Sequence, residues 1–259
     1  MEPITSTQNT KVKLANALLS RTRTRKKEGK IVLEGVRLVR DAWLNGAVPE
    51  FVLHTPGTDD EFTDKLARTG VDVSPVNDEV MRHVTDTQSP QGVVGVFPMP
   101  QPAYPADARR VLVLDAISDP GNLGTIMRTA AGAGIDVLVL APGSVDAYNP
   151  KVLRSAMGAH FRLPVMELSW EQIGEMVQVD ARYLADGSAD VAYDAVDWAA
   201  GSWALVIGSE AHGAGNEARQ FATTPITILM ERETESLNAA IATGVILFEA
   251  ARQRRQTGQ

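Results

Sequence analysis

The chain has 259 residues, of which 44% are hydrophobic, and it carries a formal net charge of −7. This length is enough to bury one large core or two modest ones, and no apolar run approaches the roughly 20 residues that a membrane-spanning helix needs. The absence of cysteine excludes disulfides, thiolate metal sites and a cysteine nucleophile, while the four histidines show no close ligand spacing. No signal-peptide pattern opens the chain. We therefore expect a cytoplasmic protein that uses no metal ion and does not enter a membrane.

Positive charge is concentrated at the N-terminal end. Residues 1–40 hold ten Lys and Arg against three acidic residues, a net charge of +7, so the remaining 219 residues carry −14. A solvated helix face would account for part of this asymmetry, but the basic stretch contains no interleaved acids for internal ion pairs. Binding to a polyanion is the other interpretation. The residues expected to make such contacts are Arg21, Arg23, Arg25, Lys26 and Lys27.

The first part of the chain, residues 1–97, predicts a small α/β domain. Apolar residues at helical spacing predict a helix over 12–19, and a second helix is expected over 36–44, closed by Asn45 and Gly46. Short apolar runs predict strands at 31–33, 51–53, 71–73 and 93–97. Alternating elements of this kind form compact two-layer or three-layer domains.

A proline-rich segment follows at residues 98–108. Four prolines fall within eight residues, at 98, 100, 102 and 105, a density that neither a helix nor a central strand tolerates. We interpret this segment as an extended linker.

Residues 109–259 predict a second α/β domain with a mostly parallel sheet. Short, wholly apolar runs typical of strands buried on both faces occur at 111–114, 137–140, 163–166, 204–207 and 226–229. Helices are expected between them, and a long last helix over 235–255. Such sheets bind ligands beyond the carboxyl ends of their strands.

The first strand of this domain leads into a polar turn with the sequence Asp-Pro-Gly-Asn at 119–122. A tight turn with Asn122 as a helix cap would explain these residues structurally, and Arg128 could be an ordinary solvated side chain. The functional interpretation is a polar turn and an arginine beside a ligand crevice, where a guanidinium suits a phosphodiester. Gly132 and Gly134 do not make a dinucleotide fingerprint, because they end a helix and the third glycine is missing.

Two further turns follow later strands. The segment 207–213 contains Gly208, which lets backbone approach a ligand closely, and Glu210, which also suits a helix start. The strand over 226–230 leads to Ser236, Leu237 and Asn238, where Ser236 could simply be the N-cap of the last helix. Three such turns from one sheet, in this order, favour a shared site.

In order and spacing these three segments resemble the signature motifs of the SpoU family of RNA ribose 2′-O-methyltransferases. Asn122 and Arg128 match the first motif, Glu210 and Gly213 the second, and residues 236–238 the third. The N-terminal unit is similar to the L30e-like substrate-binding domain often found ahead of this catalytic domain, with matches at 6–9, 34–35 and 90–92. One departure is that Leu229 stands where the family has proline.

The resemblance implies an α/β knot, a deep trefoil that pattern-based rules would not produce. It also implies a homodimer whose active site is completed near the interface, for which an apolar last helix with Val245, Ile246 and Phe248 would serve. The implied cofactor is S-adenosylmethionine, held largely by backbone near Gly208, Ile228 and Leu237.

The implied catalytic residues are Asn122, Arg128, Glu210, Ser236 and Asn238. The family proposal makes the arginine a base, but a guanidinium stays protonated in proteins, so we expect Arg128 to clamp an RNA phosphate and orient the ribose. The other four residues would hold the geometry, and positioning would supply much of the acceleration.

The implied substrate is RNA, and a structured element of large-subunit (23S) rRNA is favoured over tRNA, because the basic first helix belongs to an L30e-like domain. Two other classes of function stay open. One is a non-catalytic RNA-binding scaffold, which failure to bind S-adenosylmethionine would favour. The other is a nucleotide-dependent oxidoreductase, which a bound nicotinamide would favour.

Overall fold

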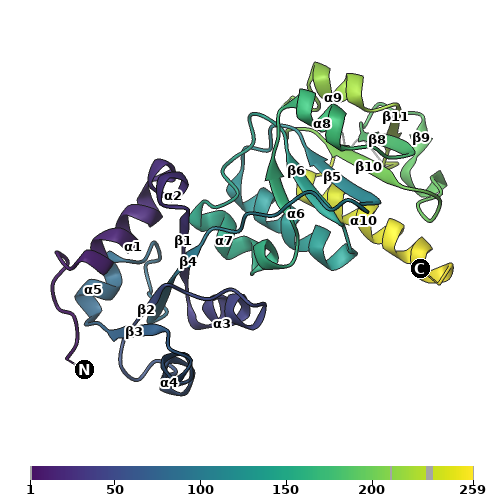
Figure 1. Ribbon diagram of the computed structural model, residues 1–259. Helices are drawn as coiled ribbons and strands as arrows, with labels where there is room; N and C mark the ends of the chain where they lie inside the picture. Colours follow the sequence, from purple (N-terminus) through teal and green to yellow (C-terminus); the bar gives the residue numbers. More distant parts are fainter. Residues whose placement is uncertain (1, 211, 232–235, 259) are drawn as a thin grey trace. The chain divides into compact units, whose positions relative to one another are not determined.

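A computed structural model describes residues 2–210, 212–231 and 236–258. The chain divides into two compact units, one made of residues 1–101 and 148–161, the other of residues 102–147 and 162–259. The segment 148–161 thus belongs to the first unit, although it lies well beyond the proline-rich segment that we expected to separate two domains. Each unit is described separately below (Figure 1).

The first unit is built around a four-stranded sheet of order β1-β4-β2-β3. Strands β1 and β2 are antiparallel to β4, and β3 is parallel to β2. The elements are α1 (Thr10–Ser20), α2 (Thr22–Glu28), β1 (Lys30–Glu34), α3 (Val36–Leu44), β2 (Phe51–His54), α4 (Asp60–Arg68), β3 (Asp72–Pro75), α5 (Asp78–His83), β4 (Val93–Pro98), α7 (Pro150–Ala156) and the 3-10 turn η1 (Ala159–Phe161).

Helices cover both faces of this sheet because alternate strand residues point to opposite sides. Val32 and Val94 pack with residues of α1 and α5 on one face. Ile31 and Leu33 face the other way, toward α3 and α4, and Leu153 of α7 joins this second core. The apolar side of α7 explains why a segment so distant in sequence folds with this unit.

The second unit has a seven-stranded sheet of order β7-β6-β5-β10-β8-β11-β9, and all of its strand pairs are parallel. Its elements are β5 (Arg110–Leu114), α6 (Pro120–Ala133), β6 (Val137–Leu140), β7 (Val165–Glu167), α8 (Trp170–Met176), β8 (Ala181–Ala185), β9 (Val191–Ala192), η2 (Tyr193–Ala195), β10 (Trp203–Ile207), α9 (Asn216–Phe221), β11 (Thr224–Thr227) and α10 (Ala239–Gln256).

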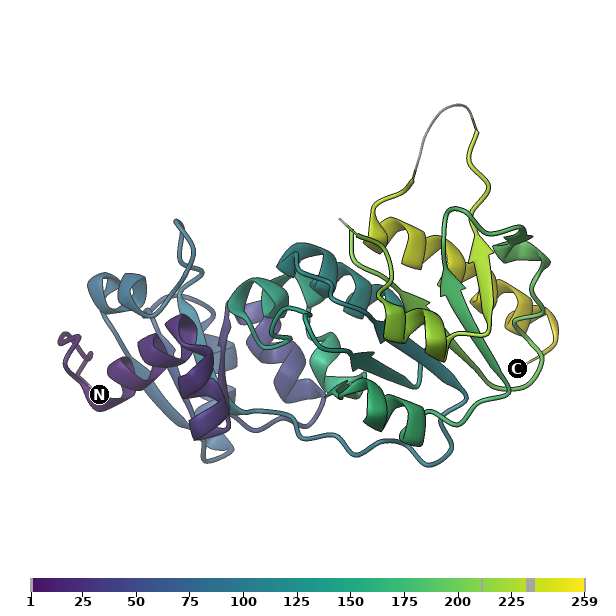
Figure 2. The same cartoon turned by 90° about the horizontal axis from the view of Figure 1, so that it is seen from above.

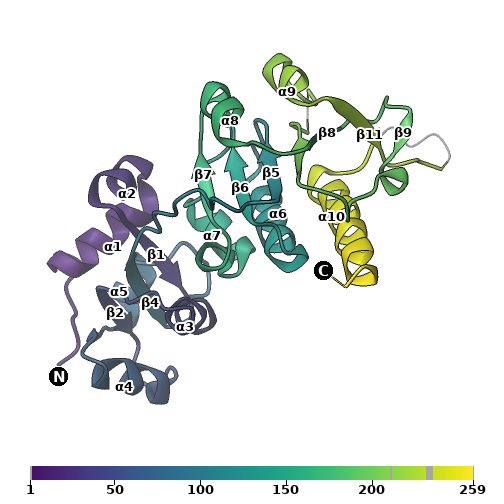
Figure 3. The same cartoon turned by 45° about the vertical axis from the view of Figure 1, so that its right-hand side comes forward.

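Helices α6 and α10 lie together on one side of this sheet, and α8 and α9 lie on the other (Figures 1 and 3). Val111 and Val113 of β5 pack in one core with residues of α8 and α9. Figure 2 shows the same elements from above, with α10 in yellow. Within the described ranges, no helix combines the length and apolar character needed to cross a bilayer.

Several predicted boundaries are wrong in detail. Strand β11 ends at Thr227, short of Ile228 and Leu229, and Leu229 is 72% exposed. The predicted start of the last helix, Glu235, lies outside the described residues, and α10 begins at Ala239. Ile246 is fully buried in the core, so it is not part of an exposed apolar face of α10.

Candidate functional site

The three signature segments meet at the carboxyl edge of the parallel sheet. From β5 the chain proceeds outward to β6 and β7, whereas β10, β8 and β11 lie on the opposite side of β5. The turns that follow the adjacent strands β5 and β10 therefore diverge, which leaves a crevice at this switch point. The first signature follows β5, the second follows β10, and the third follows β11.

Side chains from all three segments form one hydrogen-bonded chain. Asn122 donates through Nδ2 to Glu210 Oε1 at 2.7 Å, and its Oδ1 accepts from Asn238 Nδ2 at 3.1 Å. The two bonds fix the orientation of the Asn122 amide, because its oxygen and nitrogen are used by different partners. Asn122 is 88 positions from Glu210 and 116 positions from Asn238 in sequence, so the fold itself assembles the cluster.

The helix caps explain why these side chains are available. Asp119, not Asn122, is the N-cap of α6, and its Oδ1 accepts from the Asn122 backbone N–H at 2.8 Å. The N-cap of α10 is Asn238, which accepts from Ala240 N and Ile241 N, so the alternative that Ser236 simply caps this helix is wrong. Asn238 thus ends the third signature loop and joins it to Asn122 at the same time.

The loop that carries Glu210 is folded tightly on itself. Ser209 and Gly213 exchange backbone hydrogen bonds of 2.9 and 3.0 Å. A Cβ on Gly208 would lie 2.7 Å from the Ala214 Cα and even closer to neighbouring backbone atoms, so only glycine fits there. The Gly208 backbone is therefore held against the far end of its own loop.

Asp115 fixes this loop to the end of β5. Its carboxylate is nearly buried and accepts from the Gly215 backbone N–H at 2.7 Å. An unpaired buried carboxylate is costly, so this bond strongly favours the closed loop. Asp115 and Asn122 together join the first signature segment to the second at two points.

A pocket of about 290 Å³ lies beside the cluster. All three residues expected to contact the cofactor, Gly208, Ile228 and Leu237, line it, as do the expected catalytic residues Glu210 and Ser236. Apolar side chains form much of the pocket wall, which also contains charged side chains. The further lining residues that matter below are Asp186, Arg219, Ile207, Ile226 and Ile246.

An ion pair on the pocket wall joins the turn after β8 to α9. Arg219 Nη1 lies 2.7 Å from Asp186 Oδ2. Hydrogen bonds from the Ser188 hydroxyl and backbone N–H, together with the guanidinium of Arg219, lower the pKa of Asp186 to about 2. The carboxylate is therefore charged at neutral pH, and the pocket wall carries a fixed negative group beside a cation.

Comparison with protein families decides the identity of the fold. The model of the SpoU rRNA Methylase family matches residues 109–248, more than half of the chain. The chain belongs to the SpoU family. The model of the MRM3-like substrate binding domain matches residues 9–95 of this SpoU protein.

Individual relatives cover most of the chain. The rRNA methyltransferase 3, mitochondrial, of Mus musculus is 35% identical over 89% of this chain and 69% of its own length. The 23S rRNA (guanosine(2553)-2′-O)-methyltransferase RlmP of Bacillus subtilis (strain 168) is 34% identical over 96% of this chain and 98% of its own. Among solved structures, the AdoMet-bound rRNA methyltransferase from Sinorhizobium meliloti superposes with a TM-score of 0.86 at 29% identity, covering 97% of both chains. The SpoU methyltransferase AviRb from Streptomyces viridochromogenes, in complex with AdoMet, gives 0.84 at 26% identity, covering 96% of this chain and 99% of AviRb.

Arg128, the first-motif arginine of this SpoU protein, does not join the hydrogen-bonded cluster. It lies on α6 six residues beyond Asn122, about 9 Å along the helix axis. Its side chain is exposed, and within the described ranges it forms no hydrogen bond or ion pair. The guanidinium is thus available to a ligand.

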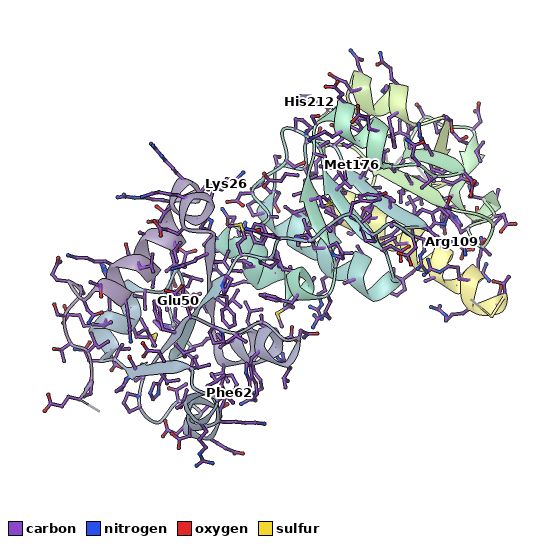
Figure 4. The ribbon with its side chains drawn as sticks, in the orientation of Figure 1. Lys26, Glu50, Phe62, Arg109, Met176 and His212 are labelled. Atoms are coloured by element: carbon purple, nitrogen blue, oxygen red, sulfur yellow. The ribbon has the colours of Figure 1, made fainter. Side chains whose placement is uncertain are left out.

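The basic helix α2 of the SpoU protein is mostly exposed, with one exception. Arg21, Arg23, Lys26 and Lys27 are exposed, and Figure 4 labels Lys26 on this helix. Arg25 is 3% exposed, and it donates through Nη1 to the carbonyls of Leu18 and Leu19 at 2.7 and 3.2 Å. Its inclusion among the phosphate-binding residues was therefore wrong, because its guanidinium satisfies the last carbonyls of α1.

Three site residues escaped prediction from sequence: Asp115, Asp186 and Arg219. Asp186 follows β8, a strand we did not predict, because only Leu184 of its five residues is buried. The turn sequence Asp-Gly-Ser at 186–188 was a usable signal for a strand end there. Within the described residues, no three His, Asp or Glu side chains come together in a way that could hold a metal ion.

Proposed function

We propose that this SpoU protein transfers a methyl group from S-adenosylmethionine to a ribose 2′-hydroxyl of ribosomal RNA, with large-subunit rRNA favoured over tRNA. The observation that carries the proposal is the chain of hydrogen bonds from Asn238 through Asn122 to Glu210, beside the pocket. Residues of all three signature segments are thereby fixed within one site.

The pocket suits S-adenosylmethionine in shape and charge. The half-buried Ile228 and Leu237 provide an apolar surface for a flat adenine, with the buried Ile207, Ile226 and Ile246 also in the pocket wall, and Gly208 allows backbone groups to approach it. The carboxylates of Asp186 and Glu210 are the negative groups that a positively charged sulfonium and amino group would favour. When bound there, the cofactor supplies an electrophilic methyl group.

The side chains of this SpoU protein then act mainly by positioning. Asn122 and Asn238, whose amides are fixed by their hydrogen bonds, would hold the ribose in line with the methyl group, with Glu210 and Ser236 at the edge of the pocket. Arg128 would clamp the RNA phosphate, because a guanidinium stays protonated and offers a fork of donors. The hydroxyl proton would leave to that phosphate or to water.

Replacement of Arg128 by lysine tests the clamp. We expect Arg128→Lys to weaken RNA binding while methyl transfer is retained at high pH, since a lysine is a poorer bidentate ligand for phosphate. RNA affinity equal to that of the unchanged protein, together with no transfer at any pH, would refute the clamp. The measurements are filter binding and initial rates across a pH series.

We further propose that two copies complete the site, with Arg128 of one copy serving the cluster of the other. The free guanidinium of Arg128 supports this, as does an exposed apolar side of α10 that carries Ile241 (57% exposed), Val245 and Phe248 (49% exposed). The all-parallel sheet, with β10 between β5 and β8, supports the trefoil knot that the family resemblance implies.

Mixing two inactive variants tests the shared site. Arg128→Ala and Asn238→Ala should each be inactive, but after subunit exchange half of the dimers are mixed and one of their two sites is intact. We expect about one quarter of the activity to return, as a two-fold dimer requires. No recovery despite verified exchange would place both residues in the site of one chain.

The deciding experiment for the function is transfer of radiolabelled methyl from S-adenosylmethionine to total rRNA and, separately, to total tRNA. Nuclease digestion then separates ribose label from base label. We expect ribose label in large-subunit rRNA. Label in tRNA would keep the chemistry and change the substrate, whereas failure to bind the cofactor would favour a non-catalytic RNA-binding scaffold.

A further inference from the structure

A second pocket lies in the first unit, at the carboxyl edge of its sheet. Strands β1, β2 and β3 all run in one direction and β4 runs in the other. The turns that follow the first three strands therefore meet the segment that leads into β4. Between them is a pocket of about 430 Å³, a size typical of sites for small organic ligands. Its polar lining comprises Thr55, Thr58, Asp78, Arg82, Gln88 and Gln91.

Two glycines allow the walls of this pocket to close. Gly92 has φ +72°, and a Cβ there would lie 2.8 Å from Thr58 Cγ2. Gly35 has φ +98°, and a Cβ there would lie 3.0 Å from Gln91 Cδ. Both positions therefore require glycine, for conformation and for space. The side chains of Thr58 and Gln91 therefore pack directly against the backbone of Gly92 and Gly35, respectively.

A buried carboxylate supports the wall that carries the glutamines. Glu34, at the end of β1, accepts from Asp86 N at 3.3 Å and from the Thr87 hydroxyl. Arg154 of α7, in the same unit, lies 3.2 Å from Asp86 and 4.0 Å from Glu34. The segment leading to Gln88 and Gln91 is thus anchored at its start by contacts within this unit.

The polar groups of the pocket are unused. Within the part of the chain that the structure describes, the side chains of Thr55, Thr58, Gln88, Gln91 and Arg82 form no hydrogen bond or ion pair with other residues. Asp78 is likewise without a partner there, and Met81, 2% exposed, supplies an apolar surface. Asp78, Arg82, Gln88 and Gln91 are exposed and the two threonines are half-buried, so these donors and acceptors are open to solvent and available to a ligand in the pocket.

The chemistry of the lining favours a nucleobase over a phosphate. Amides and hydroxyls can both donate and accept, as the edge of a base requires, and a guanidinium can stack on the face of a base. One carboxylate and one guanidinium leave the lining with no net charge, which does not favour an isolated anion. The carboxylate of Asp78 can accept from the amino group of a base.

We propose that this pocket binds one unpaired base of the RNA substrate and so contributes to the choice of RNA; the proposal rests on the proposed function only in taking rRNA as the ligand. Sequence-specific recognition of RNA uses bases that are turned out of the stack and read on their edges. The exposed cations of α2 would add phosphate contacts that do not depend on sequence.

A double variant tests the pocket in the full-length protein. Gln88→Leu combined with Gln91→Leu removes both amides at similar side-chain volume, and Gln101→Leu is the control, an exposed glutamine of the same unit that does not line the pocket. We expect the Kd for a 23S rRNA transcript, measured by filter binding, to rise about tenfold in the double variant, as for loss of one hydrogen-bonded base contact. The Kd for S-adenosylmethionine and the melting temperature should stay unchanged, and so should every property of the control.

Ultraviolet crosslinking gives a second readout that needs no methyl transfer. Trypsin cleavage places the lining residues on the peptides 41–65, 69–82 and 83–109, so a nucleotide bound in the pocket should be recovered on at least one of them. The proposal requires both results, and an unchanged RNA Kd or absence of a crosslink on all three peptides overturns it. If the crosslink forms but no methyl is transferred, the proposed function fails and the pocket stands. If transfer is normal but the crosslink is absent, the pocket fails and the function stands.

Discussion

Asn122→Asp is a sharp test of the hydrogen-bonded cluster because it changes one atom of the side chain. The amide nitrogen that donates to Glu210 at 2.7 Å becomes an oxygen, while acceptance from Asn238 is kept. Loss of a hydrogen bond to a charged group costs about 1.5–3 kcal/mol. Two like charges about 4 Å apart add about 1 kcal/mol in water and about 4 kcal/mol at an effective dielectric constant of 20. Because the cluster is solvent-accessible, we take the lower part of that range and expect a total of about 3–4 kcal/mol.

If the cluster holds the ribose in the transition state, this cost lowers kcat/KM for rRNA by about 10² to 10³-fold. Part of the rate should return at acidic pH, where a protonated carboxyl can donate to Glu210 again. The assay is the initial rate of radiolabelled methyl transfer at saturating S-adenosylmethionine. Asn216→Asp is the matched control, because it makes the same change at an exposed position in the first turn of α9, where the side chain has no hydrogen bond to any described residue. A loss below fivefold in Asn122→Asp, or an equal loss in the control, would refute the reasoning.

Three further changes probe the loops around the cofactor pocket. Gly208→Ala should weaken binding of S-adenosylmethionine more than tenfold by calorimetry and lower the free energy of unfolding by about 1–3 kcal/mol, because the new Cβ would clash with backbone atoms. The control is Gly174→Ala, whose Cβ would have no described atom within 4 Å and which should be neutral or slightly stabilising. Asp115→Ala should lower the free energy of unfolding in urea by about 1–3 kcal/mol and weaken cofactor binding. Asp115→Asn can still accept from Gly215 N, so it should retain much of the stability and of the cofactor affinity. Equal losses in the two variants would argue against that bond. Because the pKa of Asp186 is lowered to about 2, its charged form stabilises the fold above about pH 4, and this stabilisation is lost as pH falls toward 2. Asp186→Asn should therefore cost on the order of 1 kcal/mol of unfolding free energy at pH 7 and almost nothing near pH 2. A cost in urea unfolding that does not change with pH would contradict an electrostatic origin.

Prediction from sequence succeeded where one local rule determines the structure. The helix predicted over 36–44 has those bounds in the structure, and the apolar runs at 111–114, 137–140 and 204–207 are central strands. Strand β8 was missed because its partly exposed residues lack an apolar run: Arg182 lies over the ring of Phe221, and Tyr183 packs on Trp198. Its place in the sheet depends on pairing with β10 and β11, which no local pattern reports.

The site, too, was predicted where local sequence determines the structure and missed where contacts between distant residues do. The three signature segments were found because their small and polar residues follow apolar strands. The second and third segments line the pocket, and Asn122 of the first is hydrogen-bonded to Glu210 and Asn238 beside it. Which side chain caps a helix was not predictable where several polar residues compete, as at Asp119 and Asn122. The bond from Gly215 to Asp115 joins residues 100 positions apart, so only the folded chain reveals it. Arg25 stands among exposed basic residues in sequence, yet its burial depends on how α2 turns back on the end of α1.

The membership of residues 148–161 in the first unit limits how this protein can be divided. The chain passes from one unit to the other three times, after residues 101, 147 and 161, so cleavage in the proline-rich segment alone would separate residues 148–161 from the rest of their unit. A fragment that begins after that segment would carry α7 without the core that buries Leu153. A chimera joined at a single junction would therefore separate α7 from the core that buries Leu153, and three matched junctions would be needed to keep them together.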